Sequence, residues 1–443
     1  MTTTDDESRS LRIQEKESES KSSFQSLAVL VVFNLLLVFT GMHVTSIGPF
    51  FPTEARDRNI SVPTIGLIVA ILQVSQGLFA FLFLLTISEQ QKNKVAYIGF
   101  VLSGTMCVLF GESYNLNSKN WYVFGCFLTR VFIGMGGAAK WATTAPILIP
   151  LFPARAGVIF SGLEISFNFG MMIAPPLCSW LYSIGGYTIP FVVIGFAELC
   201  VGFLCFIASR SIKKPELLRE SQTVASGFNF KPAVHFLSLP GVWAVTFPFM
   251  AVLAQYGFLS VTLAVHLLDT FNLNGSQSGY VFLIHASMAT LTSVFYGYLI
   301  DKGYSKVTFL VCLALTALGY FILALPFFGF DYPRWTLYAG LIVLGISSNG
   351  GFLPCYFLFD LIGKRNNFPS EESLRLCICS WITTSYGIAL IFGQYVVGGV
   401  FFNYFDFYQS SLLLSVLTLI PAIAAGIYIV TSDVNHKHQY NPI

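Results

Sequence analysis

Charged side chains are scarce in this 443-residue chain: they make up 10% of its residues, whereas hydrophobic side chains make up 55%. A soluble domain carries about 25% charged residues, because its surface must face water. The composition therefore excludes an ordinary soluble protein and favours a protein that has the lipid bilayer as its partner.

Several functional patterns are also missing from the sequence. It contains no HExxH motif, no GxSxG motif and no membrane-facing pair of histidine and aspartate. The nine cysteines lie within or at the edges of apolar segments, which argues against a disulfide framework. We therefore expect neither an enzyme nor a protein with a cofactor, a metal site or a nucleic-acid partner.

Long apolar runs are what the sequence has in abundance. A helix needs about 20 apolar residues to cross the hydrocarbon core of a bilayer, and runs of this order recur along the chain without the alternation of a membrane barrel. The sequence therefore predicts an all-α membrane protein with twelve transmembrane helices in two six-helix bundles. The predicted spans are 26–50, 64–87, 94–112, 120–149, 155–183, 188–209, 238–266, 277–300, 307–327, 334–362, 373–402 and 408–431.

The lysines and arginines outside the spans predict the orientation, since positively charged loops stay on the cytosolic side. The N-terminal tail carries four of them, and the even-numbered loops with the C-terminal tail carry fourteen, whereas the odd-numbered loops carry four. Eighteen against four predicts that both termini are cytosolic. The N-x-Ser/Thr sequons at Asn59 and Asn274 fall in odd-numbered loops, so both are candidate glycosylation sites on the opposite side.

A polar break after the sixth predicted span divides the chain into two halves. The predicted parts are a disordered cytosolic tail at 1–25, an N-terminal bundle at 26–209, a cytosolic linker at 210–237, a C-terminal bundle at 238–431 and a cytosolic tail at 432–443. Fragments repeat between the halves: RVFIGMGG in the fourth span answers LIVLGISS in the tenth, and GMMIAPPLCSWLY in the fifth answers IALIFGQYVVGGVFF in the eleventh. Paired six-helix repeats around a midplane cavity are the plan of secondary transporters of small molecules.

Three motifs carry a resemblance to a known family. They are Arg-xxx-Gly-x-Gly in the fourth span, Gly-xxx-Ala-Pro-Pro in the fifth span, and Gly-x-Leu-x-Asp-Lys after the eighth span. They resemble motifs of the major facilitator superfamily. The segments PFFPTEA (49–55) and SGLE (161–164) are similar to the vesicular amine transporter family, within it the vesicular polyamine transporter-like group. The motif residues are Arg130, Gly134, Gly136, Gly170, Pro175, Pro176, Gly297, Asp301 and Lys302.

The resemblance implies a secondary active transporter that works by alternating access and exchanges protons for an organic amine or polyamine in acidic vesicles. Asp301 and Lys302 fall in a predicted cytosolic loop, so we expect them to form a gating latch rather than a substrate site. The glycines allow close helix packing, and the paired prolines of the fifth span kink a helix that must rock. The loop SEQQKNK (88–94) has lost most of the corresponding motif of the first half.

Four ionisable residues lie deep inside predicted spans, where each charge costs about 2.5 to 3.5 kcal/mol on insertion scales and so needs a partner or a cavity. Lys140 and Glu164 stand twelve residues to either side of Phe152, at one depth of a helical hairpin. Arg130 and Glu198 also share a depth. We therefore predict the buried pairs Lys140–Glu164 and Arg130–Glu198. A second interpretation is that Glu164 is a carboxylate that binds protons or cations in a cavity.

Further polar residues within the spans are candidates for the cavity wall, although such side chains also bridge helices. The histidines titrate near neutral pH. The candidates are His43, Asn34, Asn168, His285, Asn349 and Tyr386.

Two other functions remain open. A carrier of anionic or neutral metabolites on the same fold is favoured if Lys140 is unpaired, and a receptor or scaffold without transport activity is suggested by the altered 88–94 loop. The ending Tyr440-Asn441-Pro442-Ile443 has the form of a Tyr-x-x-hydrophobic signal for a sorting adaptor. It agrees with a location in secretory or endolysosomal vesicles, with the plasma membrane as the alternative.

Overall fold

The computed structural model describes residues 26–47, 51–87, 90–152, 155–210, 231–272, 275–330, 333–401 and 404–439. Every regular element within these ranges is a helix. The predicted N-terminal tail, the sequon residue Asn274 and the signal from Tyr440 to Ile443 lie outside the described residues. The predicted all-α fold is confirmed.

Within the described residues, the first half contains six long helices and a short one. The N-terminal helix is Ser26–Thr45. It is followed by the short α2 (Phe51–Asp57) and by α3 (Val62–Thr86), α4 (Lys92–Glu112), α5 (Lys119–Leu148), α6 (Ala156–Gly185) and α7 (Thr188–Arg210).

The second half repeats this plan after a short helix, α8 (Lys231–Ser238), which overlaps the end of the predicted linker. Its long helices are α9 (Pro240–Phe271), α10 (Gly275–Asp301), α11 (Ser305–Ala324), α12 (Pro333–Arg365), α13 (Glu371–Ile391) and α14 (Phe407–Gln439). A π-helix, Phe392–Val400, continues α13. Helix α14 extends beyond the predicted boundary at 431 into the predicted tail.

Eleven of the described helices are long and apolar enough to cross a membrane. The remaining candidate lies in α7, whose apolar part, Thr188–Leu204, is shorter. The helices agree in order and position with the twelve predicted spans, so the structure is that of a multi-pass membrane protein.

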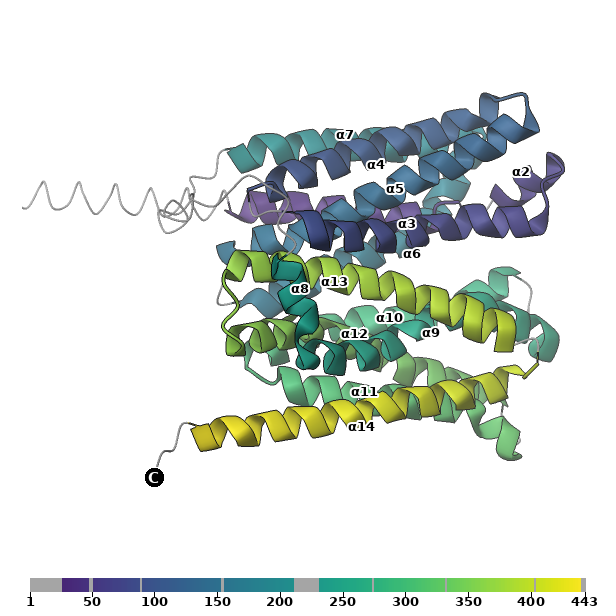
Figure 1. Ribbon diagram of the computed structural model, residues 1–443. Helices are drawn as coiled ribbons and strands as arrows, with labels where there is room; N and C mark the ends of the chain where they lie inside the picture. The colour runs from purple at the N-terminus through teal and green to yellow at the C-terminus, as the bar shows by residue number, and fades with distance from the viewer. Residues whose placement is uncertain are drawn as a thin grey trace, which may run out of the picture.

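The two halves form two bundles that lie one above the other in Figure 1, with the N-terminal bundle at the top. Helix α8 lies at one end of the molecule and α2 at the other (Figure 1). The bundles meet where α3 packs on α13 and where α6 packs on α10. At the α8 end, one apolar core includes residues of both bundles, such as Phe160 of α6 and Phe352 of α12. At the α2 end, each bundle has its own core. The bundles are therefore joined more extensively at the α8 end.

Glycines make equivalent close helix contacts in the two halves. A Cβ at Gly134 of α5 would collide with the Leu72 carbonyl of α3, and a Cβ at Gly345 of α12 would lie 2.6 Å from the His285 carbonyl of α10. Gly134 and Gly345 are the matching positions of RVFIGMGG and LIVLGISS. The sequence repeat therefore corresponds to a repeat in helix packing.

Glycines of the second repeated segment also make equivalent close helix contacts in the two halves. Gly170 of α6 faces the backbone carbonyl of Val38 in the N-terminal helix, and Gly393 after α13 faces that of Ala254 in α9. Both contacts are too close for a larger residue. Pro175 and Pro176 lie inside α6.

Candidate substrate cavity and buried polar network

A small cavity lies between the two bundles. Helices α3, α5 and α6 supply one wall, and α12 and α13 supply the other. The lining residues are Gln76, Trp141, Glu164, Phe167, Phe352, Ile382, Thr383 and Tyr386.

Glu164 is the acidic residue of this lining. It lies on the buried face of α6 with Phe160, Leu163 and Phe167, a spacing that places all four on one side of the helix. Its side chain is 5% exposed. The amide of Asn168, one turn further along α6, donates a hydrogen bond of 3.0 Å to Glu164 Oε1.

The predicted pair Lys140–Glu164 is wrong. Lys140 Nζ lies 2.6 Å from Glu198 Oε1 of α7, and both side chains are fully buried. The depth estimate had placed Glu198 level with Arg130, ten residues from Lys140, so it did not predict this pair; Lys140 faces α4 and α7, not α6. Within the part of the chain that the structure describes, Glu164 has no recorded ion pair.

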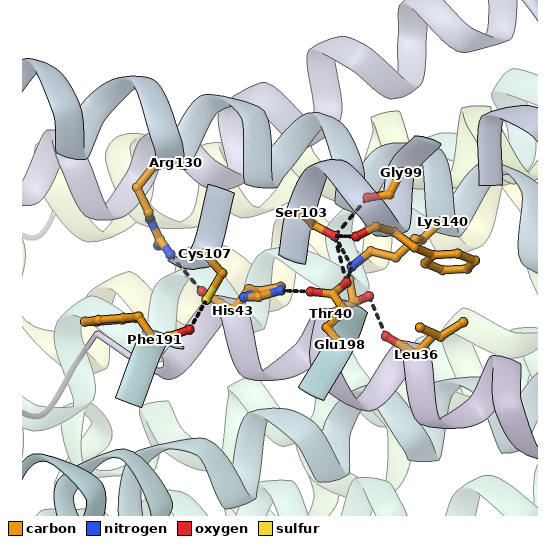
Figure 2. A network of polar contacts seen from close by, with 11 residues as sticks. Leu36, Thr40, His43, Gly99, Ser103, Cys107, Arg130, Lys140, Phe191 and Glu198 are labelled. Atoms are coloured by element: carbon orange, nitrogen blue, oxygen red, sulfur yellow. Dashed lines mark hydrogen bonds and ion pairs between the residues drawn. The ribbon is translucent and has the colours of Figure 1, made fainter. Parts of the chain in front are cut away.

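Glu198 is the centre of a buried polar network (Figure 2). Its Oε1 accepts hydrogen bonds from Lys140 Nζ and from Ser103 Oγ of α4, at 2.6 and 2.7 Å. Lys140 Nζ also donates to Ser103 Oγ at 3.0 Å. On the other side, His43 Nε2 of the N-terminal helix lies 2.6 Å from Glu198 Oε2. The network joins four helices of one bundle, and its satisfied hydrogen bonds offset the burial of the charges.

The predicted pair Arg130–Glu198 is also wrong. The guanidinium of Arg130 donates to two backbone carbonyls, that of His43 at 2.7 Å and that of Val69 in α3 at 3.2 Å. Arg130 is 1% exposed. It therefore ties α5 to the N-terminal helix and α3 through the negative ends of carbonyl dipoles, a partner type that residue counting does not reveal.

The predicted cavity residues have different positions. Of the six candidates, Tyr386 lines the cavity. Asn168 donates a hydrogen bond to Glu164, and His43 belongs to the Glu198 network.

The other three candidates bridge or brace helices. Asn34 accepts a hydrogen bond of 2.7 Å from Ser166 Oγ, which links the N-terminal helix to α6. His285 Nε2 lies 3.2 Å from Gln255 Oε1. Asn349 donates to the Ala289 carbonyl and to Ser293 Oγ.

Sequence reasoning missed most of the apolar wall, namely Phe167, Phe352 and Ile382, together with Thr383. Phenylalanine is frequent in every span, so its pattern gives no sign of which copies face the cavity. Ser103 was missed as well, because an isolated serine in a span usually bonds to its own helix, as this one also does with Gly99 at 2.9 Å.

Two polar contacts join the bundles near the α8 end. The carboxylate of Asp301, at the end of α10, accepts hydrogen bonds from the backbone N–H groups of Gly157 and Val158, at 2.6 and 3.1 Å. These groups open α6, so the carboxylate lies at the positive end of that helix. The ammonium of Lys302 lies 5.6 Å from the ring centre of Tyr298 instead.

The second contact is made by Lys92, a residue of the altered segment 88–94. Lys92 at the start of α4 forms an ion pair with Glu372 in the first turn of α13. The pair connects the two bundles with side-chain charges, whereas Asp301 connects them through a carboxylate and helix N–H groups.

Small residues determine how closely the helices approach. Gly136 of α5 leaves no room for a Cβ, which would lie 2.6 Å from the Gly99 carbonyl of α4. Gly297 of α10 packs in the same way on Gly157 of α6, with the Gly157 carbonyl 2.9 Å from a Cβ added at Gly297.

The sequon residue Asn59 lies in an exposed turn, with a positive φ of 57°. Its glycosylation stays a prediction.

Comparisons with known proteins agree with this architecture. The family model of the Major Facilitator Superfamily matches residues 33–360 and 250–441. The human protein "MFS-type transporter SLC18B1" is 25% identical over 389 residues, which cover 86% of this chain and 82% of that protein. The mouse protein of the same name is 24% identical over 421 residues, with 94% and 89% covered.

Two solved structures share the fold. The human organic anion transporter MFSD10 (TETRAN) superposes with a TM-score of 0.63 at 15% identity, covering 90% of this chain and 99% of that chain. The proton:xylose symporter XylE superposes with a TM-score of 0.68 at 14% identity, covering 91% and 95%. The family model, the relatives and the paired bundles give one conclusion: this chain belongs to the major facilitator superfamily and is a membrane transporter rather than an enzyme.

Proposed function

We propose that this transporter exchanges protons for an organic amine or polyamine, and that Glu164 binds the cation and the proton in turn. The observation that carries the proposal is a carboxyl group in the wall of the cavity between the bundles, with an amide as its recorded polar partner. A buried carboxylate without a cation is unfavourable, so it gains most from a cationic cargo or from protonation.

The position of Lys140 supports a cationic cargo. An unpaired lysine in the cavity would favour an anionic substrate, but Lys140 is neutralised by Glu198 inside the N-terminal bundle. The aromatic rings of Trp141 and Tyr386 in the cavity wall provide faces that attract cations. The charge of the cavity is therefore that of Glu164.

Alternating access fits the way in which the bundles meet. They share an apolar core at the α8 end, which is the end predicted to be cytosolic, and have separate cores at the α2 end. In this proposal an acidic compartment on the α2 side protonates Glu164 and releases the amine. On return to the cytosol the proton leaves, and the carboxylate binds a new cation. A location in acidic intracellular vesicles is part of the proposal.

The test is uptake of radiolabelled spermidine by proteoliposomes with an imposed inside-acidic pH gradient. We expect uptake by the wild type and its loss in Glu164→Gln, which keeps the shape of the side chain but can neither carry charge nor exchange a proton. Glu112→Gln is the matched control, because Glu112 is exposed at the end of α4. Absence of uptake by the folded wild type would overturn the polyamine proposal, and uptake by Glu164→Gln would overturn the role of Glu164.

A further inference from the structure

The wall of the cavity is charged on one side only. Glu164, from the N-terminal bundle, is its acidic residue, and it neutralises one ammonium group in the proposed exchange. The lining residues from the C-terminal bundle are uncharged, namely Phe352, Ile382, Thr383 and Tyr386. A polyamine carries at least one further ammonium group, which therefore needs an uncharged partner. Oxygen lone pairs and aromatic rings are the uncharged groups that side chains offer to a cation.

Tyr256 of α9 lies where the two bundles meet. Its side chain is partly buried against the apolar core that both bundles share, as are those of the lining residues Trp141 and Tyr386. The phenol of Tyr256 lies close enough to the Glu164 carboxylate to interact with it electrostatically, and the phenol of Tyr386 interacts with both. Tyr256 and Glu164 thus approach the same contact region from opposite bundles.

The oxygen of Tyr256 is an unused acceptor. Within the part of the chain that the structure describes, this atom is buried and accepts no hydrogen bond. Its polar neighbour is the hydroxyl group of Ser348 in α12. Ser348 donates its own proton to the Gly345 carbonyl at 3.0 Å, so it is not a donor to Tyr256. A buried polar atom without its partner costs about 1 to 3 kcal/mol, and a cargo that supplies an N–H group would remove this cost.

The ring of Tyr256 is held by His285 of α10. The two rings meet edge to face with their centroids 5.2 Å apart, and His285 in turn lies 3.2 Å from Gln255 Oε1. Tyr320 of α11 provides a comparison, because its hydroxyl is also buried and has no partner among the described residues. Tyr320 lies in the core of the C-terminal bundle at the α2 end. The proximity to Glu164, rather than the unbonded hydroxyl alone, therefore distinguishes Tyr256.

We propose that Tyr256 determines the specificity for diamines and polyamines: its hydroxyl oxygen accepts a hydrogen bond from the second ammonium group of the cargo while Glu164 holds the first. A diamine then connects α6 of one bundle with α9 of the other. A monoamine of the same length engages Glu164 and leaves the oxygen of Tyr256 without a donor. The inference rests on the proposed exchange at Glu164 and names the group that recognises the other end of the cargo.

The test is competition against the uptake of radiolabelled spermidine by proteoliposomes. The competitors are linear diamines and the monoamines of matching chain length. A hydrogen bond to a charged group contributes about 1.5 to 3 kcal/mol, so we expect the wild type to prefer the diamine of best-fitting length by roughly tenfold or more. Tyr256→Phe keeps the ring and its contact with His285 but removes the oxygen. We expect its preference for diamines to fall by roughly tenfold, while its inhibition by monoamines stays as in the wild type.

The matched control is Tyr320→Phe, which removes a buried, unbonded hydroxyl from the same bundle and should keep the preference of the wild type. A preference that is unchanged in Tyr256→Phe would overturn the role of Tyr256 and leave the exchange at Glu164 in place. An equal loss of monoamine and diamine inhibition would also overturn it, because a general disturbance of the cavity would then explain the result.

The wild type alone gives a second test, which does not depend on how the variant folds. Equal inhibition of the wild type by diamines and by their matching monoamines, at every chain length, would overturn the inference while spermidine uptake still supports the exchange. Absence of spermidine uptake by the folded wild type would overturn the polyamine proposal itself, and this inference with it.

Discussion

Removal of the negative charge from Glu198 should destabilise the protein strongly. In Glu198→Gln the side chain keeps its size, and its one oxygen can still accept hydrogen bonds from Ser103 and Lys140, so no void is created; the charge is lost, and an amide NH2 replaces the oxygen that faces His43. The ammonium of Lys140 is fully buried and would lose its counter-charge at 2.6 Å. Breaking a buried ion pair by removing one partner costs about 3 to 5 kcal/mol. We therefore expect a loss of that order in the free energy of unfolding.

A double-mutant cycle isolates the contribution of the Lys140–Glu198 ion pair to stability. Lys140→Met removes the buried cation, so the combination of Lys140→Met with Glu198→Gln should recover much of the stability that Glu198→Gln loses. The assay is reversible unfolding in mixed micelles, followed by intrinsic tryptophan fluorescence, with Glu112→Gln as the exposed control. The reasoning is refuted if Glu198→Gln is as stable as the wild type, or if the double variant is no more stable than Glu198→Gln alone.

Three further predictions concern the contacts between helices. Asp301→Asn should weaken the contact with the start of α6 by about 1 kcal/mol, which shifts the equilibrium toward opening at the α8 end by roughly fivefold. The labelling rate of a cysteine placed in the cavity wall measures this opening, and equal rates in the variant and the wild type would contradict the prediction. Lys92→Glu and Glu372→Lys should each impair transport, and their combination should restore it. If the double variant stays impaired, the ion pair is not what transport requires of these two residues. Gly170→Val should reduce the yield of monodisperse protein in size-exclusion chromatography, because its Cβ would collide with a backbone carbonyl, whereas Gly66→Val, with open space around it, should not.

The spans and the repeat were predictable because they depend on length and periodic composition. A run of about 20 apolar residues forms a transmembrane helix in a bilayer, because a helix satisfies its own backbone hydrogen bonds. The glycines of RVFIGMGG were equally informative, since a residue without a side chain on a packed helix indicates a close neighbour. Asp301 was recognised from its motif, although its bonds to the N–H groups of Gly157 and Val158 became visible only in the structure.

The partners of the buried charges were not predictable in the same way. Counting residues along a hairpin gives the depth of Lys140 and Glu164 but not the direction in which each side chain points. The structure places Glu198 of α7, a helix outside that hairpin, against Lys140. Arg130 bonds to backbone carbonyls, which every residue possesses, so no sequence pattern identifies them. The choice among many phenylalanines for the cavity wall likewise depends on how the two bundles face each other.

The central claim is that cargo and proton compete for Glu164, and the most direct measurement is the release of protons when cargo binds. Purified transporter in weakly buffered detergent solution is mixed with spermidine, and the change in pH is converted into protons per bound cargo. We predict proton release from the wild type and from Glu112→Gln, and a release smaller by one proton per cargo in Glu164→Gln. Binding of spermidine to the wild type without proton release, or an undiminished release from Glu164→Gln, would contradict the account.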